Sequence, residues 1–252
     1  MVTMLGISVR QLASRSKLIL IVLLALLPVA LVTLISATLS EDETSSNAEF
    51  INTLLDGLLI AGILPIVTMV LATSSFGNEL EDRTLSYLVL KPIPRWLILL
   101  PKLLASIVIG GLVVVASGVV ATLLGGSSFG AVLLVLDGNL QAALAVGVAI
   151  FVGVVTYAAI FTWAGLMTPR AIAFALIYVF VWEGLISSFL GGVRYLSVRS
   201  YTLAIMHGLD DRSFEPLGER VIEFPAAVAG AAATTAVFFW LTVRRLHRMD
   251  VP

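Results

Sequence analysis

The sequence predicts an all-α membrane protein with about six transmembrane helices. Three observations support this fold class. Of the 252 residues, 59% are hydrophobic and 12% are charged, whereas about a quarter of the residues in a soluble domain are charged. Apolar runs recur at the length of about 20 residues that a helix needs to cross a bilayer. Basic residues also gather in segments that fall on one side of such a membrane.

Six apolar runs are each long enough to cross the membrane once. They cover residues 18–39, 57–76, 103–124, 140–166, 171–190 and 225–243. A secretory signal is the alternative for the first run, but its apolar region would hold only about 7–15 residues, so we expect a retained span. A further apolar stretch, residues 130–136, is too short to span, and we expect it to connect the third and fourth helices at the interface. No linker divides residues 1–252, which we predict to form a single transmembrane domain.

The distribution of basic residues predicts the orientation, because Lys and Arg in short loops resist translocation. One side of the predicted topology carries Arg10, Arg15, Lys17, Arg83, Lys91, Arg95, Lys102, Arg170, Arg244, Arg245 and Arg248. The other side carries Arg194, Arg199, Arg212 and Arg220 in one long segment, together with Glu41, Asp42, Glu43, Glu49 and Asp137. We therefore predict a multi-pass protein of the cell (inner) membrane with both termini in the cytoplasm.

Composition and missing motifs exclude several function classes. The chain has no cysteine, which removes disulfides and thiolate metal sites. Its net charge of -1 gives no basis for a nucleic-acid partner. No Gly-Lys dipeptide occurs, so the chain lacks the phosphate-binding loop of an ATP hydrolase. The two histidines, His207 and His247, lie outside the predicted spans, and no metal-binding spacing is present. We expect no catalytic residue, cofactor or metal in this chain.

The segment between the second and third predicted spans, residues 77–102, has the pattern of a short amphipathic helix. Asn78 is a suitable N-cap, and Glu79 and Glu81 fall in the first turn, where acids complement the helix dipole. Pro92 would end the helix. One helical face would carry Leu80, Thr84, Tyr87 and Leu88. A solvated connector is the alternative interpretation of this segment.

The same segment resembles the signature of ABC-2 type transporter permeases. The resemblance rests on the run of acids, then Thr84-Leu85, an apolar stretch, Pro92-Ile93-Pro94-Arg95, and Lys102 at the opening of the next helix. It implies a coupling helix that seats in a groove of a separate ATPase subunit. The residues expected at that interface are Glu79, Leu80, Glu81, Arg83, Thr84 and Leu85. Arg83 departs from the family pattern, in which glycine is common before the threonine.

The resemblance implies further properties of the protein. It implies a non-catalytic membrane subunit that pairs with a second copy or a similar subunit and with two ATPase subunits, which would hold ATP and Mg. Export is favoured over import. The family also has a flat N-terminal helix at the cytoplasmic interface, and here Leu5, Val9 and Leu12 form an apolar stripe beside basic residues. An ion-coupled secondary transporter and a non-transporting membrane scaffold are the alternatives.

Glu183 is the only acid placed well inside a predicted span, beside Trp182. A charged group at this depth needs a partner, a water-filled cavity or a proton. Glu183 and Trp182 are therefore candidates for a translocation pathway or an outer gate. In the structural alternative, Glu183 pairs with an arginine such as Arg194 or Arg199, and Trp182 is an interfacial aromatic.

Two further segments have patterns of their own. The last span is rich in small residues, which favours close helix packing. In the outer segment, residues 191–224, the sequence pattern predicts a helix over 196–206. The resemblance implies that this region forms short helices that dip back from the outer surface. An ordinary extracellular loop is the alternative. No cluster of charged or aromatic residues indicates a substrate class.

Overall fold

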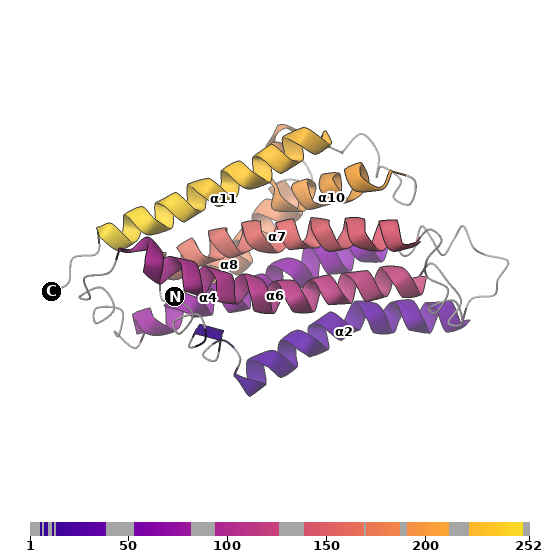
Figure 1. Ribbon diagram of the computed structural model, residues 1–252, viewed down its shortest axis with the longest axis horizontal. Coiled ribbons are helices and arrows are strands. Elements are labelled where there is room, and N and C mark those ends of the chain that lie inside the picture. The colour runs from indigo at the N-terminus through magenta and orange to yellow at the C-terminus, as the bar shows by residue number, and fades with distance from the viewer. Residues whose placement is uncertain are drawn as a thin grey trace.

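The long helices of the computed structural model lie roughly side by side along one axis (Figure 1). The structure describes residues 6, 8–9, 12, 14–38, 53–81, 94–125, 139–168, 170–186, 191–211 and 222–248. Within these ranges every regular element is helical. The predicted all-α class is therefore confirmed.

Five helical stretches are long and apolar enough to cross a membrane. They are formed by α2 (Arg15–Thr38), η2 (Leu55–Ile63) with α4 (Leu64–Glu81), α6 (Trp96–Gly125), α7 (Asn139–Met167) and α11 (Phe224–His247). The π-helix η2 continues directly into α4, and Pro65 accounts for its wide turns. A proline clashes with the carbonyl four residues earlier, here that of Ala61, and a wider turn relieves this contact. Five of the six predicted spans are confirmed by these helices.

The central helix of the bundle is α7. It packs against α4, α6, α10 and α11, and 72% of its span is buried. In contrast, only 17% of the α11 span and 22% of the α2 span are buried. Along the middle of these outer helices the exposed side chains, such as Leu23 and Trp240, are apolar. They can only be accommodated by lipid or by another membrane subunit.

Glycines let two helices approach α7 closely. A Cβ atom at Gly165 of α7 would lie 3.0 Å from the backbone oxygen of Thr73 in α4. A Cβ atom at Gly118 of α6 would lie 2.3 Å from the Cδ1 atom of Ile150 in α7. Such contacts bring backbones together where no hydrophobic driving force acts between helices.

The fifth predicted span, residues 171–190, is helical over all of its described residues. It consists of α8 (Ala171–Ile177), which continues into the π-helix η4 (Tyr178–Ile186), and the described apolar stretch is shorter than those of the other five spans. The last four residues of the predicted span, 187–190, lie outside the described residues. The chain then forms η5 (Gly191–Leu196) and α10 (Val198–Leu209).

The helix α10 lies inside the bundle, between α7 and α11 (Figure 1). Thr202 is beside the middle residue of α7, since a Cβ atom at Gly153 would lie 2.8 Å from its hydroxyl. At the other end, Gln141 donates its side-chain amide to the carbonyl of Leu209 at 3.3 Å. So α10 begins about halfway along α7 and runs to the Asn139 end. The expected helix over 196–206 is present, and residues 198–209 do not form an ordinary surface loop.

The predicted start of a separate helix at Asn78 was wrong. The helix α4 runs without interruption from Leu64 to Glu81. Because a continuing helix satisfies its own backbone hydrogen bonds, it needs no new cap where it leaves the bundle. Glu79, Leu80 and Glu81 therefore form the last turn of α4.

The apolar stripe of the N-terminal stretch packs against protein. Leu12 is buried in the main core of the bundle, and the half-buried Val9 packs against the same core. At these two positions the predicted apolar stripe contacts the bundle, and the place of this stretch at the cytoplasmic interface stays a prediction.

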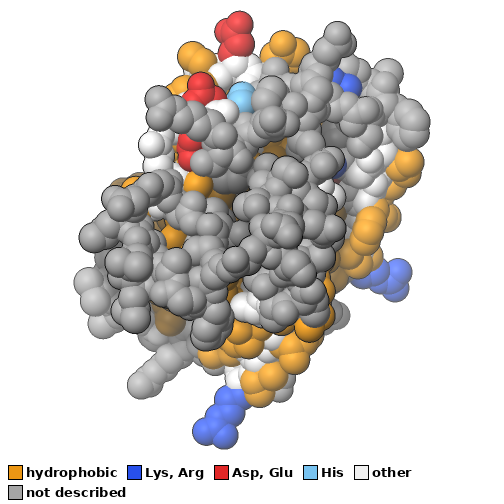
Figure 2. Space-filling model, turned by 90° about the vertical axis from the view of Figure 1, so that its right-hand side faces the viewer, with side chains coloured by type: hydrophobic (Ala, Val, Ile, Leu, Met, Phe, Trp, Pro, Cys, Tyr) orange, Lys and Arg blue, Asp and Glu red, His pale blue; other side chains and the backbone are white. Residues whose placement is uncertain are grey.

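The helix ends divide the molecule into two ends of different charge. The basic end is the end at which α2 and α6 begin and α4 and α11 end (Figure 1). The chain carries these basic residues there: Arg15, Lys17, Arg95, Lys102, Arg170, Arg244, Arg245 and Arg248. The opposite end has exposed acids, Asp211 and Glu223, after α10 and before α11. Figure 2 looks at the opposite end, where acidic side chains gather near a histidine.

Candidate functional site

A carboxylate is buried among the helices at the end of η4. The Glu183 side chain is only 4% exposed. An ionised carboxylate in such surroundings requires several hydrogen-bond donors to offset its lost hydration. The structure supplies these donors from two elements, η4 and the start of α10.

Both oxygens of the Glu183 carboxylate accept hydrogen bonds. Its Oε2 atom accepts from the hydroxyl of Ser197 at 2.5 Å and from the backbone N–H of Arg199 at 3.4 Å. Its Oε1 atom accepts from the backbone N–H of Val198 at 2.9 Å and from the hydroxyl of Tyr178 at 3.3 Å. Each oxygen therefore has at least two donors.

These contacts place Glu183 at the N-terminus of α10. The first turn of a helix has backbone N–H groups without intrahelical partners, and the helix dipole adds partial positive charge there. Ser197 caps the helix by accepting from the backbone N–H of Ser200 at 3.2 Å. Glu183 accepts from the N–H groups that remain on Val198 and Arg199. Chemically, this arrangement is an anchor that fixes where α10 begins.

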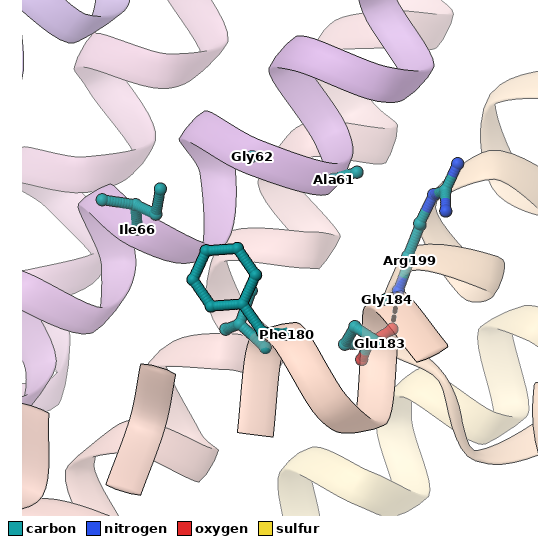
Figure 3. Close-up of a pocket in the computed structure, with 8 residues that line it drawn as sticks. Ala61, Gly62, Ile66, Phe180, Glu183, Gly184 and Arg199 are labelled. Atoms are coloured by element: carbon teal, nitrogen blue, oxygen red, sulfur yellow. Dashed lines mark hydrogen bonds between the residues drawn. The ribbon is translucent and has the colours of Figure 1, made fainter. Parts of the chain in front are cut away.

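Arg199 does not pair with Glu183 through its guanidinium group. Its side chain extends away from Glu183, and the dashed line in Figure 3 joins the carboxylate to its backbone nitrogen. The guanidinium donates instead to the carboxylate of Asp56 in η2. Its Nε atom lies 2.9 Å from Oδ1. Its Nη2 atom lies 2.8 Å from Oδ1 and 2.8 Å from Oδ2. The structural alternative, in which Glu183 pairs with an arginine such as Arg194 or Arg199, is therefore met at Arg199 only through the backbone N–H, and Asp56 is a partner of Arg199 that sequence reasoning missed.

The Asp56 and Arg199 pair joins η2 to α10. Both side chains are partly buried, with 14% and 27% of their surfaces exposed. Because the pair is two-pronged, it fixes orientation as well as distance. The sequence separation of 143 residues hides this contact from any local pattern.

A pocket of about 110 Å³ lies between η2 and η4, beside Glu183 and Arg199. It is lined by Ala61, Gly62, Ile66, Val179, Phe180, Glu183, Gly184 and Arg199 (Figure 3). Most of its wall is apolar, and the polar groups come from Glu183 and Arg199. Both flanking elements are π-helices, which occur most often near functional sites. The pocket offers an apolar surface with one charged side.

Trp182 has a different role from Glu183. Its indole N–H donates to the carbonyl of Leu196 at 3.4 Å. It thus ties η4 to the turn that precedes α10. On the other side, Tyr178 packs edge-on against Phe161 of α7, with ring centres 6.1 Å apart.

Three of the six predicted coupling residues lie within the described residues, at the basic end of α4. Glu79, Leu80 and Glu81 are in the last turn of α4. Arg83, Thr84 and Leu85 lie outside the described residues, and so does the rest of the expected amphipathic helix. Among the side chains that the structure describes, no group of three His, Cys, Asp or Glu could hold a metal ion.

Comparison with protein families decides the relationship of this chain. A family model described as ABC-2 family transporter protein matches residues 13–182. The chain belongs to this family. No curated protein matches the sequence. The matched region of the permease contains the segment between α4 and α6 but ends one residue before Glu183, so the roles of Glu183 and α10 rest on the structure.

The predicted resemblance to ABC-2 type permeases is thus confirmed. The protein is a multi-pass membrane subunit of an ABC transporter, and its family is generally non-catalytic. Membership also implies association with ABC ATPase subunits.

Proposed function

We propose that the permease is the membrane half of an exporter driven by ATP hydrolysis on separate subunits. It would act with a second copy or a similar subunit and with two ATPase subunits, which hold ATP and Mg. The observation that carries the proposal is the ABC-2 family match over residues 13–182. The absence of a phosphate-binding loop from the sequence agrees with it.

In this proposal the basic end faces the cytoplasm and both termini lie there. Lys and Arg flank most of the helix ends at that side, as the retention of basic residues in the cytoplasm requires. The opposite end, with Asp211 and Glu223, faces outward. The ATPase would then meet the permease where α4 ends and α6 begins.

The proposed contact with the ATPase is the segment that links α4 to α6. Glu79, Leu80 and Glu81 extend α4 at the basic end, and Arg83, Thr84 and Leu85 follow directly in the sequence. Acidic and basic side chains at such a contact would fix docking geometry and partner choice. The apolar face of the segment would supply the buried part of the interface.

The pocket between η2 and η4 is the proposed element of the export route. Glu183 lines it and also anchors α10, which occupies the outer half of the bundle. We place Glu183 and Trp182 at the outer gate because both hold the turn from which α10 begins. A substrate that passes here would meet mostly apolar groups.

Charge reversal at the proposed contact tests the function. With Glu79→Lys and Glu81→Lys together, we expect at least about a tenfold loss of co-purifying ATPase, since like charges across an interface cost several kcal/mol. The permease should still insert, because the positive charge on its cytoplasmic side only increases. The matched control is Asp211→Lys with Glu223→Lys at the opposite end, which should leave association unchanged.

Two results would count against the proposal. A double reversal that retains its ATPase at the wild-type ratio, with unchanged ATP hydrolysis, would remove the segment from the contact. A wild-type permease that purifies with no ATPase, and that transports in response to an ion gradient, would favour the secondary transporter with Glu183 as its ionisable group.

A further inference from the structure

A lysine is buried at the basic end of the bundle. Lys102 lies in the second turn of α6, and only 5% of its surface is exposed. A lysine near a membrane surface usually extends its ammonium group to water, because burial of the charge is unfavourable. Lys102 is directed instead into the contact between α6 and α4.

Lys102 contacts Ser75 and Phe76, which are adjacent residues of α4. Its Nζ atom donates to the backbone carbonyl of Ser75 at 2.6 Å. The same atom lies 4.4 Å from the ring centre of Phe76. A hydrogen bond from a charged donor and a cation-π contact are both strengthened when water is excluded.

Phe76 connects this contact to the rest of the bundle. The ring is fully buried in a small core at the basic end that is separate from the main core. That core contains Phe76, Ile98, Leu99, Leu166 and Leu246, contributed by α4, α6, α7 and α11. Lys102 thus holds a residue that four helices share.

A second contact fixes α4 at nearly the same level. Gly165 of α7 lets the backbone of α4 approach at Thr73, two residues before Ser75. Close backbone packing leaves little freedom for α4 to slide along α7. The part of α4 that leads into the segment before α6 is therefore held by α6 on one side and by α7 on another.

The positions of these contacts along the chain have a mechanical consequence. Ser75 precedes the segment that links α4 to α6, and Lys102 follows it. The hydrogen bond between them joins α4, which leads into this segment, to α6, which follows it. A displacement of the segment would therefore move α4 and α6 together, whereas without the bond one helix end could move alone.

We propose that Lys102 is a positioning residue that transmits movement of the segment between α4 and α6 into the membrane bundle. This inference rests on the proposed function, in which an ATPase displaces that segment. Lys102 itself touches no ATP and no transported molecule. Its role is to make α4 and α6 respond as one unit, so that movement at the basic end reaches η2 and α10.

Hydrogen–deuterium exchange of the complete transporter can distinguish docking of the ATPase on the segment between α4 and α6 from transmission of its movement to η2 and α10. The probe is Mg-ATP with vanadate, which traps the ATPase, and no transported substrate is needed. In the wild type, trapping should change exchange both in residues 82–93 and in η2 and α10. With Lys102→Met, which keeps side-chain length without charge, we expect the change in residues 82–93 to persist and most of the change in η2 and α10 to be lost.

Three further variants make the outcome specific. Lys102→Arg keeps a cationic donor and should restore part of the change in η2 and α10. Lys17→Met removes a lysine on the peripheral helix α2 at the same end and should behave as wild type. If Lys102→Met fails to fold, Phe76→Leu provides the test, because it removes the ring partner and keeps an apolar side chain.

The results distinguish this inference from the proposed function. Transmission to η2 and α10 at the wild-type level in Lys102→Met, or in Phe76→Leu when that variant replaces it, would overturn the role of Lys102. A wild-type complex in which trapping leaves residues 82–93 unchanged would instead overturn the proposed docking of the ATPase, and the inference with it.

Discussion

At the scale of single residues, Glu183 shows how backbone and hydroxyl donors accommodate a buried acid in a membrane protein. These donors are the backbone N–H groups of Val198 and Arg199 and the hydroxyls of Ser197 and Tyr178. The partial positive charge of a helix N-terminus then acts as the counter-charge. The acid determines where α10 starts, which links it to the proposed outer gate.

Replacement of this acid tests the anchor. With Glu183→Gln, one acceptor oxygen is replaced by an amide donor that faces other donors, so we expect a loss of about 1–3 kcal/mol in stability. Hydrogen–deuterium exchange should localise the effect to the first turns of α10, and thermal unfolding of the purified permease gives its size. Glu223→Gln, which changes an exposed acid before α11, is the matched control. Unchanged stability and exchange in Glu183→Gln, with reduced export, would assign Glu183 to the route alone.

At the scale of helices, the packing of α4, α6 and α11 around α7 depends on short contacts at particular positions. Gly165 allows the backbone of α4 to approach, and Gly118 accommodates the side chain of Ile150. The helix α10, which follows η4 and η5 in the chain, also packs beside α7.

A pair of alanine substitutions tests the contact between α4 and α7. Gly165→Ala should destabilise the permease by about 1–3 kcal/mol, because the added methyl group meets backbone atoms that cannot move aside. Gly77→Ala, in α4, has no atom within 4 Å of the new Cβ and should be neutral or slightly stabilising. Thermal unfolding in a fixed detergent or lipid gives both values. Equal effects of the two substitutions would contradict the close approach at Gly165.

At the scale of the whole molecule, charge and hydropathy together predict how the permease lies in the membrane. The exposed surfaces along the middle of α2 and α11 are apolar, and the two ends of the bundle differ in charge. The basic end is the side that we expect in the cytoplasm. Trp240 and Arg244 of α11 stack near this end at 5.0 Å, a contact suited to the interface.

Cysteine labelling tests this topology without background, since the sequence contains no cysteine. A membrane-impermeant reagent added to intact cells should label Asp211→Cys and Glu43→Cys. It should reach Arg83→Cys and Arg248→Cys only after the membrane is opened. Labelling of Arg83→Cys in intact cells, with protection of Asp211→Cys, would reverse the orientation.

The sequence by itself determined the helical class, five of the spans and the family, because these depend on local properties. Lipid requires a continuous apolar helix about 20 residues long, so length and composition suffice to find one. The same local information predicted Glu183 as a residue that needs a partner, a water-filled cavity or a proton.

Only the tertiary structure decided where α10 lies, which groups surround Glu183, and why Lys102 is buried. Each of these depends on contacts between residues far apart in the chain, such as Asp56 with Arg199 and Ser75 with Lys102. Hydropathy reports the preference of a segment for lipid but carries no information about its neighbours. A polar side chain in the membrane therefore has a predictable need for a partner, while the identity of that partner is set by how the helices pack.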